Sequence, residues 1–181
     1  MSDAAAVIRA AAEEDIPAIQ DIARRTWADT YRGLIPEDAQ AAVLDKAYCS
    51  ESLGRSIEAG TFLVADVGGV AGYVDVEYDG TQMNLHRLYV LPEYQRLGLG
   101  RKLLIAAVER TRSGIAPAGR DLSFSVPLVA HVERDNPQAR AFYKKAGFVE
   151  DGEETVVIGG VSLPVIRITM TVPSKTGGRL E

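Results

Sequence analysis

A change of hydrophobic period at residue 61 constrains the fold more than any other feature of this sequence. From there on, apolar and polar side chains alternate with period two through three segments, 62–67, 70–78 and 83–91. Period-two alternation is typical of half-buried strands, and the Gly-Gly and Asp-Gly pairs between the segments favour tight hairpin turns. The sequence therefore predicts a three-stranded antiparallel meander.

Helical and strand patterns alternate on both sides of this meander. Apolar residues recur at helical spacing in some segments and have strand character in others. The predicted helices cover residues 16–33, 36–59 with a break near 49–50, 101–112 and 137–146, and the further strands cover 7–10, 123–133, 148–158 and 161–172. The fold class is therefore α/β (α+β), with one mixed sheet of about seven strands and about four helices.

Composition supports one folded domain and excludes several classes of partner. The 181 residues are 46% hydrophobic and 25% charged, as in an ordinary globular protein. We expect the domain to span residues 1–172, with a disordered tail at 173–181. The formal net charge of −5 argues against a nucleic-acid partner. No apolar run approaches the ~18 residues of a membrane span. The single cysteine, Cys49, cannot form an intrachain disulfide, which favours the cytoplasm.

Charge is distributed unevenly along the chain. Residues 96–145 carry 10 basic and 4 acidic side chains, whereas residues 1–95 carry 7 basic and 16 acidic ones. The basic segment predicts a site for an anionic ligand, and the acidic segment favours a cationic second ligand.

The basic segment begins with a glycine-containing turn between a strand and a helix. Gly98 and Gly100 let backbone N–H groups approach a ligand closely, and the N-terminus of the following helix carries partial positive charge. Arg96 and Arg101 add formal charge, so the turn predicts a phosphate or pyrophosphate site. Taken alone, the turn is equally consistent with a structural strand-to-helix connection. The sequence lacks a G-x-x-x-x-G-K-[ST] loop, and Leu103 stands where a dinucleotide fingerprint needs glycine.

Two sequence blocks carry a resemblance to a known family. Gln95, Gly98 and Gly100 fill the three fixed positions of Q/R-x-x-G-x-G/A, and residues 136–148 match N-x-x-A-x-x-F-Y-x-K-x-G-F at every fixed position. With the two blocks in this order, the chain resembles the GNAT superfamily of acyl-CoA-dependent N-acyltransferases, most strongly over residues 61–148.

The resemblance implies a GNAT fold, acetyl-CoA as co-substrate and no metal. The sheet of such a fold is twisted and splays at a bulge in the fourth strand, and the acyl chain lies in the opening. By the same resemblance, the turn amides bind the coenzyme A pyrophosphate, Asn136 reaches the pantetheine arm, and Tyr143 lies near the thioester sulfur. The residues expected to contact acetyl-CoA are Leu88, Tyr89, Val90, Gln95, Arg96, Leu97, Gly98, Leu99, Gly100, Arg101, Asn136 and Tyr143.

Acetyl transfer to an amine requires a base for the ammonium proton and an acid for the departing thiolate. His86 is the first candidate base, because histidine titrates near neutral pH and period-two geometry would place it on one strand face with Leu88 and Val90. Glu77 on the neighbouring strand is the second candidate, water is a third, and both side chains are also compatible with structural roles. Tyr143 is the candidate acid, since a phenol can protonate a thiolate through a hydrogen bond, and core packing is the alternative.

The N-terminal helices are expected to cover the acceptor site, as they do in GNAT relatives. Trp27 and Tyr31 are the expected acceptor-binding residues, and they are close in sequence to several carboxylates. These carboxylates are Asp29, Glu37 and Asp38. An acidic, aromatic-lined cleft would suit a cationic amine, and residues 27–53 loosely resemble bacterial polyamine acetyltransferases. The expected acceptor is a small-molecule or peptide amine.

Two functions remain open on the sequence. The favoured one is an N-acetyltransferase that moves an acetyl group from acetyl-CoA to a primary amine by direct transfer. The alternative is a non-catalytic acyl-CoA-binding sensor or scaffold. The presence of both Asn136 and Tyr143 favours catalysis. The resemblance also implies a possible homodimer, formed through the C-terminal hairpin.

Overall fold

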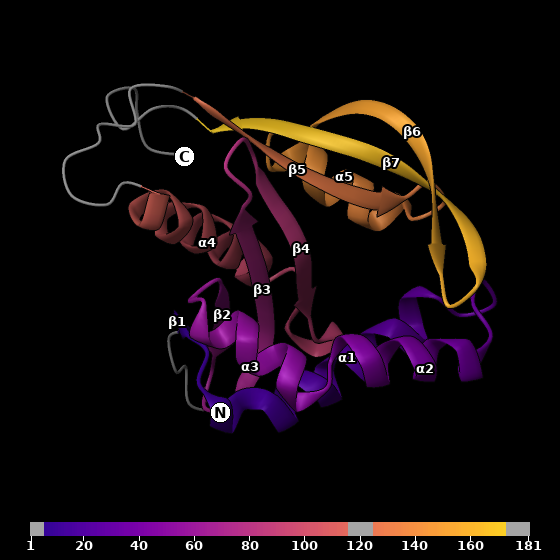
Figure 1. Cartoon of the computed structure of the whole chain (residues 1–181), viewed down its shortest axis with the longest axis horizontal. Helices are drawn as coiled ribbons and strands as arrows, with labels where there is room; N and C mark the ends of the chain where they lie inside the picture. The colour runs from indigo at the N-terminus through magenta and orange to yellow at the C-terminus, as the bar shows by residue number, and fades with distance from the viewer. Residues whose placement is uncertain (1–5, 116–124, 173–181) are drawn as a thin grey trace.

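The computed structural model describes residues 6–115 and 125–172. These residues form one mixed sheet of seven strands in the order β1-β2-β3-β4-β5-β7-β6 (Figure 1). The strands are β1 (Val7–Ala10), β2 (Phe62–Asp66), β3 (Val70–Tyr78), β4 (Met83–Val90), β5 (Val126–Glu133), β6 (Val149–Ile158) and β7 (Val161–Val172). Neighbouring strands are antiparallel except β4 and β5, which are parallel. The predicted fold class and meander are confirmed, and the predicted tail at 173–181 lies outside the described residues.

Five α-helices pack around the sheet in the described part of the chain. They are α1 (Ile16–Thr30), α2 (Glu37–Ala47), α3 (Ser50–Glu58), α4 (Leu99–Ile115) and α5 (Pro137–Lys145). The predicted helical stretch 36–59 is interrupted at Cys49, which has extended backbone angles and accepts a hydrogen bond from Ser52 N at 3.4 Å. The break divides this stretch into two helices, α2 and α3. The prediction of about four helices treated the stretch as one. None of the helices among the described residues has the length and apolarity that a bilayer span needs.

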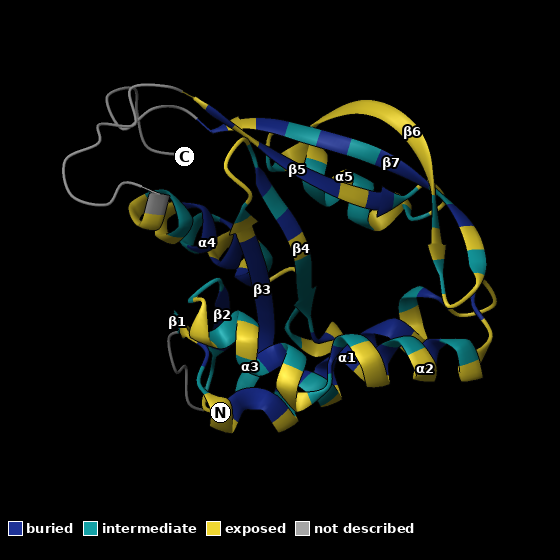
Figure 2. Ribbon diagram, viewed as in Figure 1, coloured by how far each residue is buried: buried dark blue, intermediate teal, exposed yellow. Residues whose placement is uncertain are grey.

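The helices cover the two faces of the sheet and create two apolar cores. Neighbouring residues of β3 alternate between these cores: Val74 packs on the side of α4, and Tyr73 packs on the side of α1 to α3. Figure 2 shows that most of β3, from Ala71 to Val76, is buried, whereas most of β6 is exposed. β6 is therefore an edge strand with little packing on either face.

The sheet opens between β4 and β5. These two strands pair at only two positions among the described residues, Met83 with Leu128 and Asn84 with Val129. Beyond them, β5 and its neighbour β7 run away from β4 in Figure 1. The splay predicted from the family resemblance is therefore present.

A bulge in β4 accompanies this opening. Asp75 of β3 pairs with Arg87, but the next residue, Val76, pairs with Leu85. His86 is thus the extra residue on β4, because two residues of one strand face one residue of the other. The bulge predicted in the fourth strand is confirmed, and it changes which face His86 occupies.

Candidate functional site

The turn between β4 and α4 is shaped to present backbone N–H groups. After β4 the chain forms a short 3-10 turn (Pro92–Tyr94), and Arg96 and Gly98 then have φ values of 63° and 80°. A hydrogen bond of 3.1 Å from Lys102 N to Gly98 O closes the first turn of α4. The amides before Lys102 have no partner from the helix itself, which leaves them available to an anion.

The two glycines of this turn are needed for different reasons. Gly98 has φ +80°, which side chains rarely adopt, although a Cβ there would meet nothing within 4 Å. A Cβ at Gly100 would lie 3.3 Å from Phe142 of α5 and 4.0 Å from Val90. Gly98 therefore sets the conformation of the turn, and Gly100 allows α4 to approach α5.

The end of β4 offers an unpaired backbone edge beside the turn. Along Leu88, Tyr89 and Val90, the edge that faces β5 has no strand partner in the described ranges. Gln95 Nε2 donates to Val90 O at 3.0 Å, and Gln95 Oε1 accepts from Gln138 Nε2 at 2.9 Å. These contacts join the turn to the end of β4 and to the start of α5.

The residues expected to contact acetyl-CoA surround this opening. Arg96, Leu97 and Arg101 are exposed around the turn, whereas the Leu99 side chain is 4% exposed and belongs to the core, so its backbone alone is available. Asn136 Oδ1 accepts from Ala139 N at 2.9 Å and caps α5, which leaves the Asn136 amide N–H groups for a ligand. Orphan helix amides beside an unpaired strand edge fit the pyrophosphate and the amide-containing arm of coenzyme A.

Tyr143 lies on α5 next to Phe142, whose ring lies beside Gly100 of the turn. Its ring packs edge-on against Phe142 and Phe148, with centroids 5.1 and 5.2 Å away. Its hydroxyl makes no hydrogen bond within the described residues, and burial, assisted by the negative charge of Glu133, raises the pKa of Tyr143 above that of a free phenol. The hydroxyl is thus a protonated donor with no partner in the described chain.

His86 and Glu77 form a pair on the other face of the sheet. Their Nε2 and Oε2 atoms are 3.1 Å apart, and the side chains are 47% and 61% exposed. Leu88 and Val90 pack on the α4 side, whereas His86 and Arg87 line one cavity together. The prediction that His86 shares a face with Leu88 and Val90 is wrong, because the bulge turns His86 to the α1–α3 side.

A cavity of about 540 Å³ contains this pair. Trp27, Tyr48 and Tyr89 contribute aromatic surface to it. Its charged and titratable lining residues are Asp75, Glu77, His86, Arg55 and Arg87. Trp27 thus lies where an acceptor could bind. Tyr31, the other residue predicted to bind the acceptor, is 3% exposed and does not line the cavity.

Tyr31 instead connects α1 to the end of β5. Its hydroxyl donates a hydrogen bond to Glu133 Oε1, and burial and this carboxylate together raise the pKa of Tyr31. The charge of Glu133 also acts on Tyr143. Glu133 thus lies between the two sides of the opening, and sequence reasoning gave it no role. The sequence did contain a signal for Glu133. This carboxylate ends a strand three residues before Asn136, and ligands often bind at the carboxyl ends of parallel strands.

The expected acidic cleft is not present at this position. Asp29, Glu37 and Asp38 are exposed and line neither the cavity described above nor its neighbour on α2 and α3. The neighbouring cavity, of about 520 Å³, is instead lined by basic side chains of three different elements. These are Lys46, Arg55 and Arg87.

Comparisons with known proteins agree with this geometry. Residues 58–150, about half of the chain, match a family model described as an acetyltransferase (GNAT) domain. The chain is 33% identical over 160 residues to an uncharacterized N-acetyltransferase of Lactobacillus delbrueckii subsp. lactis, covering 81% of this chain and 86% of that protein. It is 28% identical over 153 residues to a spermidine N(1)-acetyltransferase of Thermoplasma acidophilum, covering 80% and 89%. The solved PaiA N-acetyltransferase of Thermoplasma acidophilum, in complex with coenzyme A, has the same fold, with a TM-score of 0.74, 24% identity and coverage of 92% and 98%.

Proposed function

Since this chain belongs to the GNAT family of acetyltransferases, we propose that it transfers the acetyl group of acetyl-CoA to a primary amine by direct attack within a ternary complex. Acetyl-CoA supplies an acyl group activated as a thioester. The protein must then bind the donor, orient the amine, remove a proton from the ammonium group and return one to the departing thiolate. Residues described above are suited to each task.

On the side of the opening where acetyl-CoA, the acetyl donor, would bind, backbone groups make most of the proposed contacts. The orphan amides at the start of α4 bind the pyrophosphate, with Arg96 and Arg101 beside them. The unpaired edge of β4 from Leu88 to Val90 holds the pantetheine amides, and a backbone N–H near Val90 donates to the carbonyl oxygen of the acetyl group. The Asn136 amide group contacts the same arm.

The acceptor side supplies the base. His86 Nδ1 accepts the ammonium proton, while His86 Nε2–H donates to Glu77 Oε2, 3.1 Å away, which orients the imidazole and stabilises its protonated form. Both groups reach solvent, so the proton leaves through the cavity. If Glu77 is instead the group that accepts the proton, His86 becomes its orienting partner.

Tyr143 supplies the acid. Its hydroxyl stays protonated because burial raises its pKa, and it makes no competing hydrogen bond within the described residues. The neighbouring Phe142 contacts Gly100 of the donor turn. This juxtaposition of a protonated phenol and an anion-binding turn at one opening is the observation that carries the proposal.

Thiol release tests this proposal. Purified protein is incubated with acetyl-CoA and a panel of small amines, polyamines and peptides, and products are identified by their mass shift. We expect amine-dependent thiol release with a matching acetylated product. Polyamines belong in the panel because a relative is named a spermidine N(1)-acetyltransferase. Saturable coenzyme A binding without any amine-dependent thiol release would instead support the sensor or scaffold function.

The homodimer through the C-terminal hairpin stays a prediction. β6 is an edge strand, and its Val149 and Val157 side chains are 67% and 68% exposed. Acidic residues along the same strand, including Glu150 and Asp151, are paired with Arg140 and Arg167 of the same chain, and such charged pairs on an edge strand disfavour edge-to-edge pairing. Light scattering at several protein concentrations measures the oligomeric state.

The cytoplasmic location likewise stays a prediction.

A further inference from the structure

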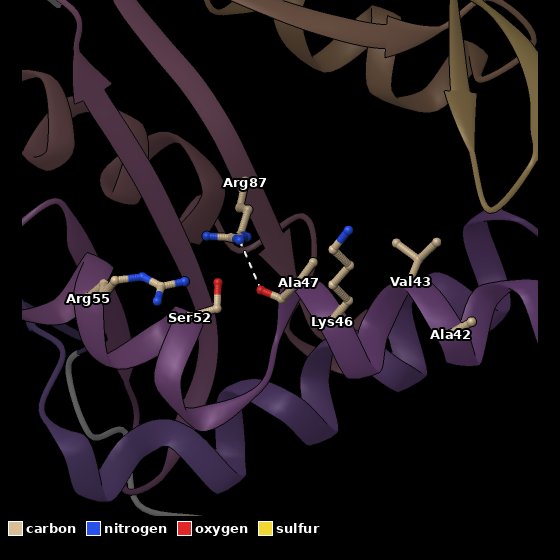
Figure 3. Close-up of a pocket in the computed structure, with 7 residues that line it drawn as sticks. All are labelled: Ala42, Val43, Lys46, Ala47, Ser52, Arg55 and Arg87. Carbon is tan, nitrogen blue, oxygen red and sulfur yellow. Dashed lines mark hydrogen bonds between the residues drawn. The ribbon is translucent and has the colours of Figure 1, made fainter.

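We propose that the acceptor carries an anionic group, a carboxylate or a phosphate, in addition to its amine, and that Lys46, Arg55 and Arg87 bind that group. This inference rests on the proposed function and specifies its acceptor class. Figure 3 shows the three side chains, which come from α2, α3 and β4, directed into one space. The seven residues that line this cavity include three cations and no carboxylate.

Arg87 is held in place before any ligand binds. Its Nη1 donates to the buried Asp75 Oδ2 at 2.6 Å, its Nη2 donates to Ala47 O at 3.1 Å, and its guanidinium lies 5.0 Å from the centre of the Tyr48 ring. These contacts use part of the guanidinium and leave other N–H groups toward the cavity. A fixed guanidinium binds an oxygen anion without a large loss of side-chain entropy.

The other two cations are free to move toward a ligand. Lys46 is exposed and forms no ion pair with any residue in the described ranges. Arg55 pairs with Glu51 at 2.7 Å, but both side chains are exposed and one turn apart on α3, an arrangement that contributes little stability. Ser52, which also lines the cavity, lies in the first turn of α3, where the helix dipole adds positive potential.

The basic cavity adjoins the one that contains the proposed base. Ala47, Arg55 and Arg87 line both cavities. Asp75, Glu77 and His86 line the second cavity alone, and the Asp75 carboxylate is paired with Arg87 at 2.6 Å. The combined space therefore has a proton-accepting end and a cationic end, with Arg87 between them. A molecule with an ammonium group at one end and an anion at the other matches this order of charges.

Charge also selects against an acceptor with two ammonium groups. The second ammonium group of such a molecule would face Lys46 and Arg55 as a like charge.

Matched acceptors test the inference. Three series with equal chain lengths are compared by kcat/KM for thiol release: ω-amino acids, aminoalkyl phosphates and ω-diamines. At the best chain length, we expect one anionic series to exceed the diamines by about tenfold or more, because charge pairing separates the two classes. A preference between the first two series identifies carboxylate or phosphate as the natural group. Equal or better turnover of the diamines overturns the inference and leaves the proposed function intact.

Single substitutions test whether the basic cavity causes the preference for anionic acceptors over diamines. Lys46→Gln and Arg55→Gln should each lower kcat/KM for the anionic acceptor about three- to tenfold and raise diamine turnover, because each substitution removes a charge that repels the second ammonium group. Arg24→Gln is the matched control, since Arg24 is an exposed arginine on α1 that lines neither cavity. Equal effects of the three substitutions would show that overall charge, and not this cavity, sets the preference, which contradicts the inference.

A binding measurement separates this inference from the proposed function. Trp27 is the single tryptophan of the chain and lines the cavity, so its fluorescence reports occupancy without turnover. N-acetylated ω-amino acids and N-acetylated diamines are titrated into the coenzyme A-saturated protein. If the anionic product binds more tightly than the diamine product, and Lys46→Gln weakens that binding, the cavity assignment is supported. This holds even if no acceptor turns over. In that case only the proposed function is contradicted. Equal binding of both products contradicts the cavity assignment whatever the turnover.

Discussion

At the scale of single residues, the ionisation of Tyr143 connects the structure most directly to the reaction. Burial, with a smaller contribution from Glu133, raises the pKa of Tyr143, so the hydroxyl remains protonated throughout the neutral range. We expect Tyr143→Phe to lower kcat by about 100-fold, the scale of a lost general acid, and to leave the Kd of acetyl-CoA nearly unchanged. Phenylalanine keeps the packing against Phe142 and Phe148. Steady-state thiol release and calorimetry measure the two quantities.

Two further variants sharpen this prediction. Tyr78→Phe makes the same chemical change on β3, where the hydroxyl donates to Gly80 O, and should leave kcat unaltered. Glu133→Gln removes the charge that helps to raise the pKa of Tyr143, so that pKa should fall while kcat at neutral pH keeps its protonated acid. An unaltered kcat in Tyr143→Phe would exclude this residue as the acid.

His86 permits a second test at this scale. Histidine ordinarily changes charge between about pH 5 and 8, so His86→Ala should lower kcat/KM and remove the limb on the acid side of the pH profile. The control is His131→Ala, because His131 is the other histidine of the chain and is 3.2 Å from Glu154 of β6. A profile identical to that of the unaltered protein would assign the base to Glu77 or to water.

At the scale of elements, the turn before α4 determines whether the donor can bind. We expect Gly98→Val to weaken acetyl-CoA binding by about tenfold or more, because a β-branched residue is strained at φ +80° and the amides would turn away from the pyrophosphate. Gly114→Val in the same helix is the control, since a Cβ there meets nothing within 4 Å and the φ value is ordinary. Calorimetric titration of coenzyme A compares them, and equal affinities in the two variants would contradict the role of the turn.

The elements that the sequence predicted best are those with local signals. Asn136 caps α5 through its own side chain, Pro137 occupies the first position, and Gly147 ends the helix with φ +96°. Each of these signals acts within a few residues, so the sequence alone reveals it. The period-two segments of the meander were predicted for the same reason.

The parts that the sequence did not predict depend on contacts between distant residues. The bulge was expected in the fourth strand, but alternation could not show that His86 is the extra residue, because His86 and Arg87 are both polar. The Tyr31 contact with Glu133 joins residues 102 positions apart, and the Arg87 pair with Asp75 joins two strands. Such pairs become visible only when strand register and helix packing are known.

At the scale of the whole molecule, the sum of charges along a segment did not predict the sign of a cavity. Many acidic residues of the first 95 positions lie on exposed helix faces, as Asp29 and Glu37 do. Three of the seven basic residues of the same segment converge, because α2, α3 and β4 bring Lys46, Arg55 and Arg87 together. The local potential follows this convergence and not the segment average.

The free energy of unfolding of the whole domain should decrease in acid, because a buried carboxylate stabilises the fold only while it is ionised. Asp15 is buried where α1 begins, and it accepts hydrogen bonds from Arg9 Nη1 at 2.7 Å and from Ala12 N at 2.9 Å. The Arg9 guanidinium is the main cause that lowers the pKa of Asp15 below its ordinary value. A free aspartate has a pKa of about 3.9, so above that pH the carboxylate is ionised in both states and its stabilisation is complete.

As the pH falls below about 3.9, the unfolded chain binds a proton at Asp15 before the folded protein does, and the free energy of unfolding decreases. Asp15→Asn should lose about 2 kcal/mol of this free energy at neutral pH, the scale of a charged hydrogen bond. The stability of this variant should then fall less steeply in acid, because the asparagine side chain does not titrate. Urea unfolding of both proteins from neutral to acid pH measures the two slopes. Asp66 shares the Arg9 guanidinium, at 3.0 Å, so the difference between the two curves reports Asp15 together with its effect on Asp66. Parallel pH curves would show that Arg9 does not stabilise the fold through Asp15.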